Sequence, residues 1–159
     1  MQETRVLFVC LGNICRSPTA HGIFQAYVDR ENLSHVIRIE SAGTSGWHVG
    51  DPPDSRAMAA AKSRGFDLSR LRGRGFTASD FLAFDYILAM DNDNLSAMQA
   101  LQPSTYTGHL SLFLDFSQQT AYREVPDPYY GAADGFSTVL DLVEDGCAGL
   151  LEHIRQTRS

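Results

Sequence analysis

The sequence predicts an α/β fold: one domain of three layers, with a central sheet of four parallel strands flanked by helices. Three observations support this prediction. Short apolar segments rich in β-branched and aromatic residues alternate with longer segments of helical periodicity. The 159 residues, 43% of them hydrophobic, suffice for one substantial core. No repeat, linker or low-complexity tract divides the chain, so residues 1–159 are expected to form a single domain.

Four segments have the character of buried parallel strands. In the first, a continuous apolar run from Val6 to Val9 follows the polar start of the chain, and Cys10 stands at its end. The other three are similar short runs separated by helical patterns. Strands are therefore expected at 5–9, 36–41, 86–90 and 109–113.

Helices are expected between and after these strands. Ser17 and Pro18 are typical of an N-cap followed by proline at the first helical position. Thr77 and Asp80 have the spacing of a capping box that begins a short helix. The last helix is the clearest, because apolar side chains recur along it with a 3.6-residue spacing. The longer helices are predicted at 18–31, 54–64, 91–101 and 134–155.

The loop between the first strand and the first helix carries the strongest chemical signal. It places the Cys10 thiol and the Arg16 guanidinium at its two ends, just before a helix whose free N–H groups favour anions. Arg16 offers a planar fork of donors for two phosphoryl oxygens, and Ser17 can donate a hydrogen bond to a Cys10 thiolate. Gly12 and Asn13 tolerate the left-handed backbone that a tight loop requires. The loop is thus interpreted as a phosphate cradle that holds a nucleophile, formed by Leu11, Gly12, Asn13, Ile14, Cys15, Arg16 and Ser17.

Two long loops, 42–53 and 114–133, are expected to border the crevice at the carboxyl ends of the strands, where Cys10 also lies. Trp47 is in the first loop, and Tyr129 and Tyr130 are in the second. A loop tryptophan is commonly a lid on the core. Rings from both loops can instead form the walls of a slot for a flat aromatic group.

Asp127 is the candidate general acid, because breaking a phosphate monoester requires a proton for the departing oxygen. Pro126 and Pro128 restrict the backbone on either side of it. The local sequence alone favours an ordinary Pro-Asp-Pro turn, and only a match to a family motif reverses that preference.

Together these motifs resemble those of the low-molecular-weight protein tyrosine phosphatases, and the resemblance runs over nearly the whole chain. The family loop Cys-x5-Arg-[Ser/Thr] is matched from Cys10 to Ser17, and its Asp-Pro pair is matched at Asp127 and Pro128. Segments 41–50 and 84–91 resemble two further family signatures. Four matches in order are specific, whereas any one of them alone is weak.

The resemblance implies metal-independent hydrolysis of phosphotyrosine, and of aryl phosphate monoesters generally, with no cofactor. It implies that Cys10 is the nucleophile that forms a cysteinyl-phosphate, that Arg16 clamps the phosphate and that Asp127 is first the acid and then the base. The remaining roles concern the aromatic walls of the cleft and the side chains that fix the loop. The resemblance assigns the walls to Trp47, Tyr129 and Tyr130, and the fixing of the loop to Asn13, Ser17 and Ser41.

Cysteine usage indicates a reducing compartment, since the three thiols are odd in number and lack the spacing of a disulfide framework or a zinc site. Cys147 falls on the apolar stripe of the last helix and is expected to pack in the core. Cys15 is either a buried filler or a redox partner that traps Cys10 as a reversible disulfide. The residues leave both open, and the resemblance favours the redox partner.

Charge and hydropathy restrict the partners. The net charge is −6 and lysine occurs once, which makes the chain a poor nucleic-acid binder. No apolar run approaches the ~20 residues of a membrane span, so neither membrane nor nucleic acid is expected as a partner. Four arginines between positions 64 and 74 form either a solvated loop or a surface that steers anions. We expect a cytoplasmic monomer, with weak self-association possible through exposed aromatics at the site. Its substrates would be phosphotyrosine-containing proteins and its product inorganic phosphate.

Three alternatives remain, and one residue departs from the family pattern. An arsenate reductase of the same fold relays electrons through further cysteines, and residues 76–133 contain none. Protein arginine phosphatases commonly carry threonine where this chain has Ile14. A binding module without catalysis would need neither Cys10 nor Asp127. Finally, family members often have histidine where Arg70 stands, and arginine cannot accept the hydrogen bond that histidine accepts.

Overall fold

The computed structural model describes residues 3–129 and 135–158. Its four strands form one sheet in the order β2-β1-β3-β4, and every neighbouring pair is parallel. The register sets Cys10 beside Gly43 and Val9 beside Ala89, so the carboxyl ends of the three strands concerned meet at one edge. The predicted fold class is confirmed. The strands are β1 (Thr4–Cys10), β2 (Ile37–Gly43), β3 (Tyr86–Ala89) and β4 (His109–Leu112).

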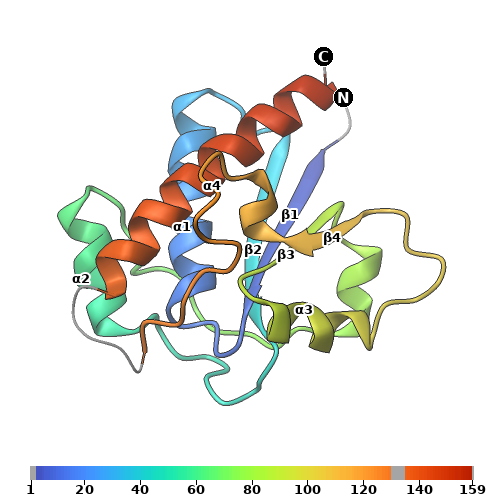
Figure 1. Cartoon of the computed structure of the whole chain (residues 1–159), viewed down its shortest axis with the longest axis horizontal. Helices are drawn as coiled ribbons and strands as arrows, with labels where there is room; N and C mark the ends of the chain where they lie inside the picture. Colours follow the sequence, from blue (N-terminus) through green and yellow to red (C-terminus); the bar gives the residue numbers. More distant parts are fainter. Residues whose placement is uncertain (1–2, 130–134, 159) are drawn as a thin grey trace.

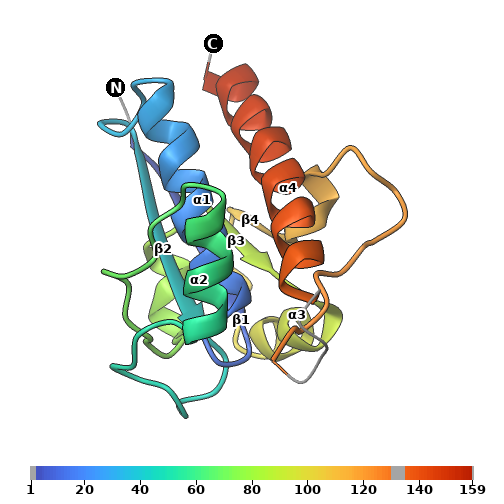
Figure 2. The ribbon, with the colours of Figure 1, turned by 90° about the vertical axis from the view of Figure 1, so that its left-hand side faces the viewer.

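Helices cover both faces of the sheet (Figures 1 and 2). The two long helices run side by side over one face with α2 next to them, and α3 lies on the other face (Figure 2). Short 3-10 helices η1 (Ala78–Leu82) and η2 (Phe113–Phe116) precede β3 and follow β4. The α-helices are α1 (Arg16–Arg30), α2 (Ser55–Ser63), α3 (Asn92–Gln99) and α4 (Gly135–Arg158).

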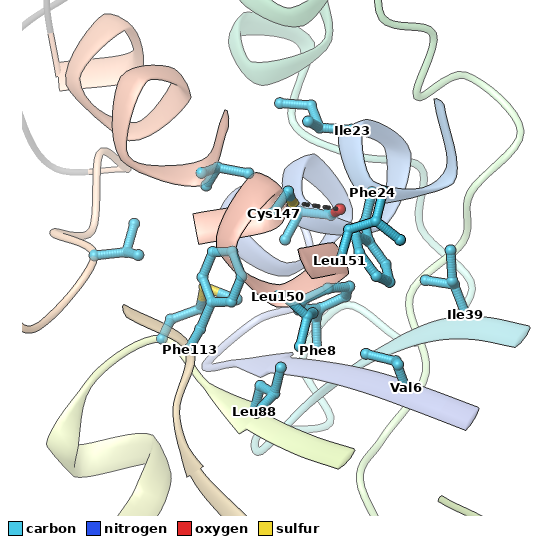
Figure 3. Close-up of a cluster of buried hydrophobic side chains, with 14 of the residues drawn as sticks. Val6, Phe8, Ile23, Phe24, Ile39, Leu88, Phe113, Cys147, Leu150 and Leu151 are labelled. Atoms are coloured by element: carbon cyan, nitrogen blue, oxygen red, sulfur yellow. Dashed lines mark hydrogen bonds between the residues drawn. The ribbon is translucent and has the colours of Figure 1, made fainter. Parts of the chain in front are cut away.

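Strand β1 is the centre of the core. Val6 and Phe8 point toward α1 and α4, whereas Leu7 and Val9 point toward η1 and α3, and all four are fully buried. This explains the unbroken apolar run in the sequence, because a parallel strand covered on both faces has no polar side to show. The ring of Phe8 meets that of Phe24 edge-on at 5.7 Å between centroids (Figure 3).

The start of the first helix differs from the prediction. Helix α1 begins at Arg16 with Cys15 at the N-cap, so Ser17 is not the N-cap and Pro18 is not its first residue. The Ser17 hydroxyl lies instead 3.0 Å from the sulfur of Cys10. A serine followed by proline is a reasonable local signal for an N-cap, but in the fold the Ser17 side chain contacts Cys10 and Asn13 of the loop.

The other helix starts are close to the prediction. Asp54 and Asp91 cap α2 and α3 by accepting hydrogen bonds from backbone N–H groups of the first turn. Thr77 and Asp80 form the expected capping box, although the helix that follows is 3-10 rather than α.

The predicted loop 114–133 differs at its start, because residues 114–116 belong to the short helix η2, which begins at Phe113. This short helix packs tightly under α4. A side chain at Gly146 would meet the ring of Phe113, and one at Gly149 would meet the backbone carbonyl of Phe116. The two glycines of α4 therefore allow η2 to approach, a tertiary contact that has no local sequence signature.

Candidate active site

The loop after β1 is held by the side chain of Asn13. This residue has a left-handed backbone with φ of 58°, as expected, whereas Gly12 does not. The Asn13 amide nitrogen donates to Ser17 Oγ at 2.8 Å, and its amide oxygen accepts from the backbone N–H of Arg74 at 2.9 Å. The glycine at position 12 is explained by close packing rather than by its backbone angle, because a Cβ there would lie 3.1 Å from the ring of His48.

The Cys10 sulfur lies on the floor of this loop, and the residue is 2% exposed. Two donors face it: the backbone N–H of Asn13 at 3.3 Å and the hydroxyl of Ser17 at 3.0 Å. Asn13 already donates to the Ser17 oxygen, and the Ser17 hydroxyl proton has two acceptors within reach: the Cys10 sulfur at 3.0 Å and the carbonyl of Ala42 at 3.4 Å, of which the sulfur is the nearer. The Cys10 sulfur is therefore placed to accept hydrogen bonds from both Asn13 and Ser17.

Arg16 lies beside Cys10 and is 3% exposed. One terminal nitrogen, Nη1, donates to the carboxylate of Asp91 at 2.6 Å and to the carbonyl of Val125 at 2.9 Å. The other, Nη2, is 3.6 Å from the carboxylate of Asp127. Burial lowers the pKa of the Arg16 guanidinium, but the negative charges of Cys10, Asp91 and Asp127 outweigh burial and leave that pKa above its ordinary value.

Asp127 reaches the same place from the segment between η2 and α4. Its carboxylate accepts a hydrogen bond from the backbone N–H of Tyr129 at 3.0 Å and faces Arg16 with its other oxygen. The segment is anchored just upstream by Val125, which is fully buried and donates from its N–H to the carbonyl of Met90 at the end of β3. Two separate parts of the sequence, the loop after β1 and the segment before α4, thus bring Cys10, Arg16 and Asp127 together.

These residues line one cleft. Its floor consists of loop residues, and its sides include Trp47 and Tyr129, both well exposed. Tyr130, the third predicted wall residue, lies outside the described residues. The full lining is Cys10, Leu11, Gly12, Ile14, Cys15, Arg16, Trp47, His48, Asp127 and Tyr129.

The described contact of Ser41 is with α1, where its hydroxyl lies 3.2 Å from Nδ1 of His21. Burial lowers the pKa of His21 to about 4, so its ring is neutral at pH 7. Arg70 is exposed, and the hydrogen bond that holds the loop from this side of the molecule comes from the backbone N–H of Arg74.

The other two thiols differ from Cys10. Cys15 packs with Ala57 and Phe136, and burial, with help from Asp54 and Cys10, raises the pKa of its thiol to about 12. Cys147 is fully buried against α1, where its sulfur donates a weak hydrogen bond to the carbonyl of Ala20 (Figure 3), and its pKa is likewise raised by burial. Cys147 therefore belongs to the core, as expected.

Sequence reasoning missed two residues of the site. Asp91 follows β3 directly and was contained in a segment matched to the family, but no role was assigned to it. A carboxylate at the carboxyl end of a strand next to β1 was the available signal. His48 lines the cleft with its Nδ1 3.1 Å from the carboxylate of Asp51. It lies next to Trp47 in segment 41–50, which resembles a family signature, and this was the available signal.

Two of the four arginines of the cluster, Arg64 and Arg74, form ion pairs. Arg64 pairs with Asp141 and Glu144 of α4, and Arg74 pairs with Asp80 and with Glu40. Within residues 3–129 and 135–158, no group of three or more His, Cys, Asp or Glu side chains has the arrangement of a metal site. In the same part of the chain, no helix is both long enough and apolar enough to cross a membrane.

The family model described as "Low molecular weight phosphotyrosine protein phosphatase" matches residues 5–159. A Synechocystis relative ascribed to the low molecular weight protein-tyrosine-phosphatases is 47% identical over 148 residues, which covers 92% of this chain and 94% of the relative.

Solved structures agree with the sequence comparison. A crystal structure of a protein tyrosine phosphatase from Entamoeba histolytica superposes with a TM-score of 0.94 at 39% identity, covering 99% of this chain and all of the other. A Drosophila arginine phosphatase superposes with a TM-score of 0.87 at 33% identity, covering 94% of this chain and 96% of the other.

Proposed function

The chain belongs to the low molecular weight phosphotyrosine protein phosphatase family, and from this membership we propose the residue-level mechanism by which it hydrolyses phosphotyrosine. The reaction is a double displacement at phosphorus without a metal ion, carried by Cys10, Arg16 and Asp127. The observation that carries the proposal is the convergence of these three side chains on one cleft, with the Asp127 carboxylate 3.6 Å from the guanidinium of Arg16.

In the first step the Cys10 thiolate attacks phosphorus, and the bond to the tyrosyl oxygen breaks. Asp127, protonated at the start, gives its proton to that oxygen, so that a neutral phenol leaves. Arg16 and the amides of residues 11–16 hold the equatorial oxygens, where the transition state concentrates negative charge. The buried pair with Asp91 supports this role because it fixes the plane of the guanidinium before substrate arrives.

In the second step water attacks the cysteinyl-phosphate. Asp127, now a carboxylate, removes a proton from the water, and the Cys10 thiolate leaves as inorganic phosphate forms. The hydrogen bond from Ser17 stabilises the departing sulfur, which carries a full negative charge in the product. One serine hydroxyl therefore assists Cys10 both as nucleophile and as leaving group.

The walls of the cleft favour an aryl phosphate. Trp47 and Tyr129 contribute aromatic rings to the lining of the cleft, and the apolar side chain of Ile14 lines it as well. A flat phenyl ring buries apolar surface against such walls, whereas a short phosphoserine does not reach them.

A protein arginine phosphatase is the second candidate, because a Drosophila arginine phosphatase shares the fold over 94% of this chain. The fold does not discriminate between the two activities. The apolar Ile14 favours the tyrosine substrate, since it offers no hydrogen-bond acceptor to a phosphorylated guanidinium.

The setting of the enzyme is also a proposal. The three cysteines are all buried and free, which suits a reducing compartment such as the cytoplasm. On oxidation by a peroxide, Cys10 becomes a sulfenic acid, and condensation with the Cys15 thiol releases water and leaves a disulfide that a dithiol reduces. The protein works as a monomer, with Trp47 and Tyr129 as the exposed surface for weak self-association, which sedimentation at several concentrations tests.

The test of the proposed function is hydrolysis of para-nitrophenyl phosphate in EDTA, followed by phosphotyrosine, phosphoserine and phosphoarginine peptides. Activity that resists EDTA, disappears in Cys10→Ser and prefers phosphotyrosine is the expected result. A preference for phosphoarginine would favour the second candidate. Absence of turnover by the intact, fully reduced protein would refute both.

A further inference from the structure

Arg56, in the first turn of α2, joins two segments that form the cleft, and no sequence motif indicates this contact. Its Nη2 donates to the backbone carbonyl of Tyr129 at 3.2 Å. Its guanidinium also lies 5.3 Å from the centroid of the Tyr129 ring and 5.1 Å from that of Phe136, at the start of α4. One side chain therefore holds both the backbone and the ring of Tyr129.

Asp54 fixes this guanidinium in place. The Nε and Nη2 of Arg56 donate to the two carboxylate oxygens of Asp54 at 3.1 and 3.0 Å, in the parallel geometry that arginine makes with a carboxylate. Asp54 is itself attached to the phosphate-binding loop, since its backbone N–H donates to the carbonyl of Ile14 at 2.8 Å. The pair thus connects the loop that holds the phosphate with the segment that carries Asp127.

The contact reaches Asp127 through one further hydrogen bond, from the backbone N–H of Tyr129 to the Asp127 carboxylate. Upstream, the same segment is anchored at Val125, which bonds to Met90 and Arg16. Asp127 therefore lies between two anchors two residues away on either side. Residues 117–129 contain no helix or strand, so such contacts must fix the position of the carboxylate.

We propose that Arg56 is a positioning residue that holds the general acid Asp127 over the leaving oxygen by clamping Tyr129. The proposal rests on the function assigned above to Asp127. A general acid must stay within hydrogen-bond distance of the atom it protonates, and a misplacement of about 1 Å is enough to cost up to ~100-fold in rate. Arg56 acts through Tyr129 and does not touch the reacting atoms.

The test uses Arg56→Met with Arg64→Met as its matched control. The hydrogen bond from the backbone N–H of residue 56 to the Asp54 carboxylate, at the start of α2, does not depend on the side chain and is kept in Arg56→Met. Arg64 follows the other end of α2 and pairs with Asp141 and Glu144 of α4, so its loss removes comparable ion pairs between residues that do not line the cleft. Thermal unfolding of both variants measures the structural effect of each.

The readout is kcat/KM for a series of aryl phosphates whose leaving phenols have increasing pKa, because this parameter reports the step in which Asp127 gives its proton. Good leaving groups need little protonation, and poor ones need it most. We expect Arg56→Met to lose ~10-fold more on phenyl phosphate than on para-nitrophenyl phosphate. The series for Arg64→Met should run parallel to that of the unaltered protein.

An equal loss of kcat/KM for every substrate in the series, or no loss at all, would overturn the proposal. A merely structural role of Arg56 would lower kcat/KM by the same factor whatever the leaving group. Asp127→Asn serves as the reference. If Asp127→Asn shows the steep dependence and Arg56→Met does not, only the role of Arg56 fails. If the dependence of kcat/KM on the leaving group is the same for Asp127→Asn as for the unaltered protein, the assignment of Asp127 as the acid fails. Should Arg56→Met not fold, Arg56→Lys, which keeps the charge but lacks the planar fork, is expected to show a smaller steepening, and a parallel series would count against the proposal.

Discussion

The guanidinium of Arg16 donates a 2.6 Å hydrogen bond to the carboxylate of Asp91, a residue 75 positions further along the chain. The pairing of β1 with β3 makes this possible, because Arg16 opens the helix after β1 and Asp91 follows the end of β3. Asp91 also caps α3 by accepting from the backbone N–H of Asn94. One carboxylate therefore orients the phosphate clamp and begins a helix.

Asp91→Asn is expected to separate these two tasks. Asparagine is as good an N-cap as aspartate, so α3 should keep its start, while the charged partner of Arg16 is lost. We predict a fall in kcat/KM of roughly 10- to 100-fold from misorientation of Arg16, measured on para-nitrophenyl phosphate. Asp91→Ala should in addition lose about 1 kcal/mol of unfolding free energy in urea. Activity of Asp91→Asn equal to that of the unaltered protein would contradict the role of the pair.

Ser17→Ala removes the hydroxyl that faces the Cys10 sulfur. A hydrogen bond to a charged group contributes roughly 1.5–3 kcal/mol, which corresponds to a fall in kcat of roughly 10- to 150-fold when the thiolate is the leaving group. Breakdown of the cysteinyl-phosphate should then limit the rate, and stopped-flow mixing should show a burst of para-nitrophenol.

Ser45→Ala is the matched control for this substitution, because the buried Ser45 hydroxyl has no hydrogen-bond partner among the described residues. Its kcat should stay close to that of the unaltered protein. Equal kcat values for the two variants would show that the Ser17 hydroxyl does not act on the sulfur.

His21 is expected to make stability depend on pH. In the unfolded chain its pKa is about 6.5, whereas burial lowers it to about 4 in the folded protein. Between these values the unfolded state binds more protons, so the stability that the neutral ring provides is complete above pH 6.5 and is lost on acidification. From pH 7 to pH 5 this one group should cost up to about 2 kcal/mol.

Urea unfolding of the unaltered protein and of His21→Asn at both pH values measures this loss. The asparagine side chain can still bond to Ser41 but does not titrate. The variant should therefore lose about 2 kcal/mol less than the unaltered protein between pH 7 and pH 5. An identical pH dependence of the two proteins would show that His21 does not govern it.

The three cysteines should differ in reactivity. Burial raises the pKa of Cys15 to about 12 and also raises that of Cys147, so both remain thiols at pH 7. Iodoacetamide at pH 7 is expected to label Cys10 alone, as mass spectrometry of the digested protein can show. Inorganic phosphate should slow this labelling by occupying the cleft, and faster labelling of Cys15 than of Cys10 would be incompatible with the site as described.

Much of the fold was predictable because local and global signals agree. The unbroken apolar run around Phe8 indicated a doubly covered parallel strand, and Asp54 and Asp91 marked the starts of two helices within one residue. Helix η2 was not predictable, because it depends on the approach of Phe116 to Gly149 across the sequence. Local patterns carry no information about such a contact.

The features of the site likewise fall into those that a local motif predicts and those that depend on tertiary contacts. The residues of the loop from Cys10 to Ser17 could be identified because their chemistry is contained in one short motif. Contacts made by distant residues could not: the pairing of Asp91 with Arg16, the bond from Ser41 to His21 and the clamp of Arg56 on Tyr129 all depend on how strands and helices meet. Ser17 shows the opposite error, because a local cap signal was overridden by its contact with Cys10.

The central claim is that Cys10 carries the phosphoryl group between the two steps, and trapping that intermediate tests it most directly. A phosphotyrosine peptide is mixed with the protein in EDTA and quenched in acid within milliseconds, and the digested chain is analysed by mass spectrometry. The account predicts one phosphoryl group on the peptide that contains Cys10, and none on the same peptide of Cys10→Ser. Turnover without any phosphoryl group on Cys10 at early times, or one found on another residue, would contradict it.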